Sequence, residues 1–161
     1  MEKNIENLNQ QINDNFKKAF YDVLSEKIKQ EPPDYDWLER LYTELRDKLC
    51  GILKKGSTLR IEIEDGMDLT LFSQMIRNNA FDATELYKQI MYIFEKFKQL
   101  GSPGRDIEVD EKKQEILDMM ARNCTFYEIV PVFFKNCYYC LENIYYDLGK
   151  FSESLQEYTK K

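Results

Sequence analysis

Two cysteines three residues apart are the most obvious candidates for chemistry in this chain. Cys137 and Cys140 have the CxxC spacing that redox enzymes and zinc sites share. A redox pair needs a helix N-terminus to stabilise its thiolate, and a four-cysteine zinc site needs Cys50 and Cys124 to converge on the pair. The pair lies well inside an expected helix, and the chain has no second CxxC. We therefore interpret these cysteines as small buried apolar residues and predict no bound metal.

The segment GSPGRD, residues 101–106, separates two helix-like stretches. A phosphate-binding P-loop needs a strand before its glycines and a Lys-Ser/Thr pair after them, and this segment has neither. It predicts a corner instead, with Gly101 in a left-handed position, Pro103 preventing continuation and Asp106 beginning the next helix. We expect Arg105 to bridge back to helix carbonyls or to an acidic group. A contact of Arg105 with a peptide or phosphate is the alternative.

The sequence gives little support for other metal sites or for catalytic nucleophile pairs. Residues 61–68, IEIEDGMD, gather four carboxylates without the ligand spacing of an EF-hand, which indicates a solvated acidic corner. The chain contains no histidine, so Ser-His and Cys-His nucleophile pairs are excluded. We predict no catalytic residue, no cofactor and no enzymatic activity.

The length and net charge of the chain limit the number of domains and the kinds of partner that we expect. The chain has 161 residues, the size of one domain, and a formal net charge of −6. That charge disfavours nucleic acid and anionic membrane surfaces as partners. The most apolar window, residues 126–148, contains four charged residues and is not expected to span a membrane. The polar N-terminus has no signal-peptide core, so we expect reduced cysteines and a cytoplasmic or otherwise intracellular location.

Apolar residues recur at steps of three and four along most of the chain, which predicts a single all-α domain over residues 1–161. The alternation in residues 58–64 is also compatible with a strand, but a lone strand has no partner, so we favour a short helix. We expect a bundle of about six to seven helices with short corners, at residues 4–30, 36–53, 58–64, 69–80, 82–100, 106–120 (from 106 or 110) and 125–158.

Helix starts and breaks follow from the capping residues. Three pairs have the capping-box spacing, and Asp68 is a single N-cap candidate. Pro131 is expected to kink the last helix and Gly149 to divide it. The three capping-box pairs are Asp36 with Glu39, Asp82 with Glu85, and Thr125 with Glu128.

The last expected helix is unusually aromatic. Nine Phe and Tyr residues lie between positions 126 and 151, more than one helix face needs. Such a helix is either central in the core or covered on one side by a partner. Tyrosine suits a contact surface because it has an apolar body and a polar tip. The candidate interface residues are Tyr138, Tyr139, Tyr145, Tyr146 and Phe151.

Residues 41–151 resemble the T-complex protein 11 family. The resemblance rests most on SPGRDIEV at 102–109, a Pro-x-Arg-Asp corner in which Ser102 replaces the family's usual alanine. It makes Pro103, Arg105 and Asp106 a structural signature. The other matching stretches are LYTELRDKLCGIL at 41–53, MDLTLFSQMIRNNAFDATELYKQIMYIFEKF at 67–97 and LENIYYDLGKF at 141–151.

The resemblance implies a non-enzymatic helical scaffold or regulatory protein, loosely tied to cyclic-AMP and protein kinase A signalling. Family members are typically much longer, so the chain is expected to be a short, C-terminally truncated member. A surface that longer members cover would here meet a protein partner or a second copy, as in a homodimer. The alternative is a self-assembling structural or host-interaction protein, for example in the particle of a large DNA virus, because the composition resembles coding from an AT-rich genome.

Overall fold

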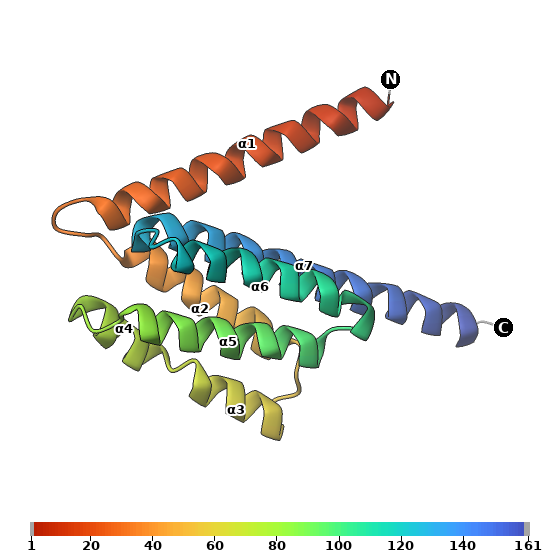
Figure 1. The fold of residues 1–161 in the computed structure, drawn as a ribbon. Helices are drawn as coiled ribbons and strands as arrows, with labels where there is room; N and C mark the ends of the chain where they lie inside the picture. The colour runs from red at the N-terminus through yellow and green to blue at the C-terminus, as the bar shows by residue number, and fades with distance from the viewer. Residues whose placement is uncertain (1, 160–161) are drawn as a thin grey trace.

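The computed structural model describes residues 2–159, with side chains from residue 4 to residue 156. All regular elements in this range are helical, which confirms the all-α prediction. The elements are α1 (Glu2–Lys29), α2 (Asp36–Gly51), α3 (Thr58–Gly66), α4 (Leu69–Arg77), α5 (Ala83–Leu100), the 3-10 helix η1 (Pro103–Arg105), α6 (Asp106–Ala121) and α7 (Phe126–Thr159). Figure 1 shows α2 to α7 packed together, while α1 leaves them at an angle.

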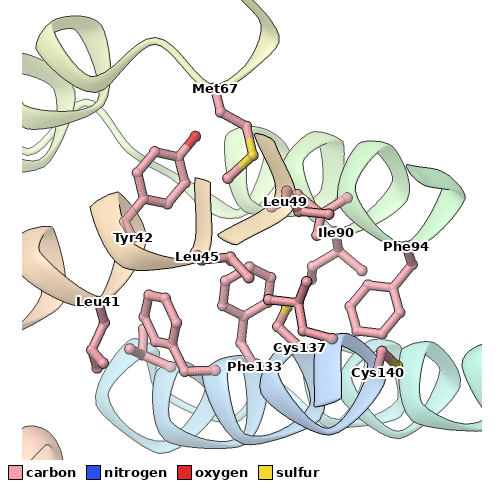
Figure 2. Close-up of a cluster of buried hydrophobic side chains, with 14 of the residues drawn as sticks. Leu41, Tyr42, Leu45, Leu49, Met67, Ile90, Phe94, Phe133, Cys137 and Cys140 are labelled. Atoms are coloured by element: carbon pink, nitrogen blue, oxygen red, sulfur yellow. The ribbon is translucent and has the colours of Figure 1, made fainter. Parts of the chain in front are cut away.

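The centre of the core lies where α2, α5 and α7 meet (Figure 2). Each helix contributes residues three or four positions apart, so that one face of the helix is apolar and turned inward. The labelled side chains from these helices are Leu41, Tyr42, Leu45, Leu49, Ile90, Phe94, Phe133, Cys137 and Cys140, all of them buried. Burial of this cluster is the main stabilising contribution to the fold, and it covers one side of the middle of α7.

Residues 58–64 form a helix, as expected. Ser57 caps α3, because its hydroxyl accepts from the backbone N–H of Arg60 at 3.4 Å. Ile63 is buried on the inner side, and Arg46 of α2 donates to the carbonyl oxygen of Glu64 at 3.1 Å. The alternating pattern therefore reflects a short helix with one buried face.

Two expected caps are present and one capping box is wrong. Asp68 accepts from the N–H of Leu71 at 2.9 Å, and Asp82 accepts from that of Glu85 at 3.0 Å. The expected box at the start of α2 is absent, because the N-cap position is Tyr35 and makes no side-chain cap bond.

The carboxylates of Asp36 and Glu39 bind Arg77 of α4 instead. Arg77 donates to Glu39 through Nε and Nη2, both at 2.9 Å, and to Asp36 through Nη2 at 3.0 Å. A charge-assisted, bidentate pair is stronger than a bond to a neutral backbone N–H. The two acids therefore join α2 to α4, and the carboxylate of Asp34 accepts from the first N–H of the helix, that of Asp36, at 3.0 Å.

Gly101 is not left-handed, which corrects the expected C-terminal motif of α5. Its φ of −89° and ψ of 177° are extended values that other residues adopt. A Cβ atom at this position would lie 2.8 Å from the carbonyl oxygen of Phe97 and 3.4 Å from Ile144. The glycine is needed because the corner packs closely against the end of α5 and against α7.

The helix α7 is continuous from Phe126 to Thr159, so the expected division at Gly149 is wrong. Pro131 lies inside it and cannot donate a hydrogen bond to the carbonyl oxygen of Tyr127, one turn earlier. The hydroxyl of Ser25 donates to that oxygen instead, at 2.8 Å. The proline thus creates an attachment point for α1.

The outer ends of α1 and α7 extend beyond the bundle. In Figure 1 the N-terminal half of α1 stands clear of the other helices, and the C-terminal end of α7 projects past α6. In α1 only Leu24 and Ile28 are buried among the residues with described side chains, and in α7 no described residue after Ile144 is buried. Both projecting ends are amphipathic helices with an apolar side exposed.

Candidate interaction surface on the last helix

The corner at residues 101–106 is attached to α7 by its arginine. Arg105 donates to Asp147 through Nε at 3.1 Å and through Nη2 at 3.0 Å, a bidentate arrangement. Its Nη1 donates to Glu108 at 3.2 Å. The bridge from Arg105 to an acidic group is therefore present, and Asp147 is a partner that sequence reasoning did not identify.

These contacts shift the ionisation of both partners. The hydrogen bond from Arg105 lowers the pKa of Asp147, and the bond to Asp147, followed by the one to Glu108, raises the pKa of Arg105. All three guanidinium nitrogen atoms donate to carboxylates within the chain. The alternative role of Arg105, a contact with a peptide or phosphate, would require these bonds to break.

Pro103 and Asp106 set the shape of the corner. Pro103 begins η1, and α6 begins at Asp106 as expected. The N-cap of α6 is Arg105, which makes no side-chain cap bond, and Oδ1 of Asp106 is buried with no hydrogen-bond partner among the described residues. Asp106 therefore does not cap α6 as expected. It lies in the first turn of α6, where its negative charge interacts favourably with the helix dipole.

Three of the candidate tyrosines bind within the molecule. The hydroxyl of Tyr138 donates to the carbonyl oxygen of Leu41 at 3.1 Å, and that of Tyr145 donates to the carbonyl oxygen of Lys48 at 2.6 Å. The hydroxyl of Tyr139 donates to Glu108 at 3.1 Å. These bonds attach α7 to α2 and α6, so part of the aromatic excess holds the bundle together.

The other two candidates, Tyr146 and Phe151, are exposed. The ring of Tyr146 lies 5.6 Å from Nζ of Lys150, and Phe151 is 64% exposed. Tyr146 and Phe151 lie on opposite sides of α7, because five residues correspond to about 500°, or 140° beyond one full turn. They therefore cannot belong to one contact face.

Phe151 belongs to an apolar stripe that continues the core-facing side of α7. Cys137, Leu141 and Ile144 are buried, and the same three-and-four spacing then leads to Leu148, Phe151 and Leu155. We name these last three residues the distal stripe. Leu148 and Leu155 are 43% and 49% exposed, respectively. Sequence reasoning missed both because it selected aromatic residues, although the spacing was visible.

Three of the four cysteines lie where burial disfavours the thiolate. Cys137 and Cys140 are buried in the core (Figure 2), and burial raises the pKa of Cys137 well above its usual range and that of Cys140 to about 12. Cys50 is buried, and burial raises its pKa too. Cys124 is half-buried. Among residues 4–156, no three Cys, Asp or Glu side chains are grouped as a metal site.

A groove of about 540 Å³ lies between α1 and α7. Its walls carry charges of both signs, so it selects for neither anions nor cations. The charged residues that line it are Asp14, Lys17, Lys18, Asp22, Lys112, Lys135 and Glu142.

Comparisons with known proteins identify the family. The model of the T-complex protein 11 family matches residues 1–148. The chain is 33% identical over 101 residues to human T-complex protein 11 homolog, which covers 62% of this chain and 19% of the relative. It is 31% identical over 101 residues to human T-complex protein 11-like X-linked protein 1, with the same coverage, and 30% identical over 100 residues to rat T-complex protein 11 homolog, with 62% and 17% covered.

The chain thus spans a small part of the length of the curated relatives it matches. No solved structure matches it significantly. Within the described part of the chain, no helix combines the length and apolar character needed to cross a membrane. The family model covers most of the chain, including α1 and the Pro103–Asp106 corner, and on that ground the chain belongs to the T-complex protein 11 family.

Proposed function

We propose that this chain is a non-enzymatic helical interaction module of the T-complex protein 11 type, which binds a helix of a partner protein along the distal stripe of α7. The observation that carries the proposal is the continuation of the core-facing side of α7 beyond the bundle. Leu148, Phe151 and Leu155 have the spacing of a helix-packing face and are exposed. An amphipathic partner helix recognises such a face through anchors at these spacings.

The family corner contributes to this function by fixing the helix that carries the stripe. The bidentate bond of Arg105 to Asp147 lies one residue before Leu148. It joins α7 to the α5–α6 corner where the bundle ends. A rigid, preorganised helix loses less entropy on binding than a loose one. The Pro103–Asp106 signature therefore supports the interaction surface and does not itself contact the partner.

The other roles predicted from the sequence are not part of this proposal. Tyr138, Tyr139 and Tyr145 support α7 and are not proposed as anchors. The connection to cyclic-AMP and protein kinase A signalling stays a prediction of the family resemblance. The self-assembling structural role, in a virus particle or elsewhere, stays an alternative that abundance and stable self-association would favour.

The test is a pull-down that compares two matched variants. Phe151→Asp places a charge in the distal stripe, and Tyr146→Asp places the same charge on the opposite side of α7. Each purified protein is immobilised and exposed to lysate of cells that express the chain. We expect one or more proteins to be retained by the wild type and by Tyr146→Asp, and lost with Phe151→Asp.

Circular dichroism of both variants checks that they fold, since neither residue is buried. Retention of the same proteins by Phe151→Asp would disprove a role for the distal stripe. Loss of the retained proteins with Tyr146→Asp alone would mean that the binding face lies on the other side of α7.

A further inference from the structure

The outer side of α1 carries a second exposed apolar stripe, separate from the distal stripe of α7. Except for Phe20, its members lie on roughly the opposite side of the helix from Ser25 and Ile28, which contact the bundle. Phe20, four residues before the buried Leu24, lies at the edge of the stripe that faces α2. We name it the outer stripe. It consists of Ile5, Leu8, Ile12, Phe16, Phe20 and Val23, which are 38–72% exposed.

The outer stripe is straight. The spacing of Ile5, Leu8 and Ile12 repeats eleven residues later as Phe16, Ala19 and Val23. An eleven-residue repeat corresponds to about 3.67 residues per turn, close to the 3.6 of a straight helix. The stripe therefore runs nearly parallel to the helix axis for about 27 Å. A second straight helix can lie along its whole length.

The spacing of the outer stripe is also palindromic about position 14. Ile5 and Val23 are nine residues from that position on either side, Leu8 and Phe20 are six, and Ile12 and Phe16 are two. Two copies of the stripe in antiparallel orientation therefore align every member with a partner: Ile5 with Val23, Leu8 with Phe20, and Ile12 with Phe16. Such self-complementarity is what a twofold interface between identical chains requires.

A recess at the base of the outer stripe fits the same arrangement. It has a volume of about 260 Å³ and lies between α1 and α2. The ring of Phe20 forms one wall and stacks on Trp37, with ring centroids 5.1 Å apart. In the antiparallel alignment, Leu8 of the second copy lies opposite Phe20, at the mouth of this recess. The projecting half of one α1 thus lies level with a hollow on the other, which is lined by Phe20, Trp37 and Leu41 and by the charged Arg40 and Glu44.

The charge distribution along α1 and the area of the outer stripe are compatible with association of two identical chains. Residues 7–13 contain no charged side chain, so two copies approach along this segment without direct repulsion despite a net charge of −6. Covering the stripe and the recess buries roughly 500 Å² on each copy, which brings the total to about 1,000 Å², the lower limit for a stable interface.

We propose that two copies of this chain associate through antiparallel pairing of the outer stripes of α1, centred near position 14. The interface leaves the distal stripe of α7 free, so self-association and partner binding are separate properties. The proposal does not depend on the proposed function.

Sedimentation velocity over a range of concentrations tests the association. We expect a wild-type dimer and a monomeric Ile12→Asp variant. Asn7→Asp is the matched control, because it adds the same charge on the side of α1 away from the stripe, and it should leave the dimer intact. A wild type that stays monomeric up to about 1 mM would overturn the proposal. So would a dimer that persists in Ile12→Asp, or one that Phe151→Asp dissociates.

Spin labels test the orientation of the two helices. Labels on Asn15→Cys, in a Cys124→Ser background, should lie close together in the dimer. Labels on Asn4→Cys should lie about 30 Å apart along the axis, because antiparallel pairing separates the two positions by twenty residues. Close approach of the Asn4→Cys labels would mean parallel pairing and would contradict the proposal.

Discussion

Arg105 and Asp147 show how a single ion pair connects distant parts of the sequence. They are 42 residues apart, and the bidentate bond between them joins the α5–α6 corner to α7. The hydrogen bond lowers the pKa of Asp147 in the folded protein. A carboxylate with a lowered pKa stabilises the fold at pH values above its ordinary pKa, and this contribution disappears as the pH falls through the folded pKa.

We expect Asp147→Asn to lower the melting temperature at pH 7, because the amide keeps the shape but loses the charge. The difference from the wild type should be constant down to the ordinary pKa of 3.8 and should vanish below the folded pKa. Thermal melts from pH 7 to pH 2 measure it. Asp22→Asn, at an exposed position, is the control. A difference that does not change with pH would mean that the carboxylate charge is not responsible.

The attachment of α1 to α7 depends on a proline. Pro131 has no N–H, so the carbonyl oxygen of Tyr127 lacks its usual partner within the helix. Ser25 supplies a donor at 2.8 Å. Gly101 has a similar effect on helix packing, because its missing side chain allows the end of α5 to approach Ile144 of α7. Both contacts between helices depend on a missing group: the N–H that Pro131 lacks and the side chain that Gly101 lacks.

We expect Ser25→Ala to destabilise the protein by about 1 kcal/mol, the net contribution of one hydrogen bond with a half-buried acceptor. In a Pro131→Ala background the helix regains its own N–H donor to Tyr127. The cost of Ser25→Ala should then fall to a few tenths of a kcal/mol. Urea unfolding of the four proteins in this double-mutant cycle measures the coupling. Equal costs in both backgrounds would show that the proline and the serine act independently.

At the scale of the whole molecule, stability is concentrated where α2, α5 and α7 meet. The projecting ends of α1 and α7 contribute apolar surface without burying it. Phe134 is 1% exposed and lies in the core, whereas Phe16 is 72% exposed on the outer stripe. Two phenylalanines of one chain therefore have very different energetic roles.

We expect Phe134→Ala to lower the free energy of unfolding by about 3–5 kcal/mol, because it removes buried area and leaves a cavity. Phe16→Ala should change it by less than about 0.5 kcal/mol at concentrations low enough for the monomer. Chemical denaturation of the dilute proteins measures both. A large loss with Phe16→Ala in the monomer would mean that the N-terminal half of α1 packs on the bundle.

The sequence by itself determined the helices and most of their ends. Periodic apolar residues predict a helix because the 3.6-residue turn brings them to one side, and the GSPG segment at residues 101–104 predicts the end of α5. Asp68 and Asp82 are caps because their acceptors lie one turn from the N–H groups they bind.

Only the tertiary structure decided which apolar sides are covered. The spacing of Ile5, Leu8 and Ile12 is as regular as that of Leu38, Leu41 and Leu45, yet only the second set is buried. Burial depends on neighbouring helices, which local spacing does not specify. In the same way, Glu39 has the position of a capping residue but binds Arg77, because the fold brings a stronger charged partner within reach.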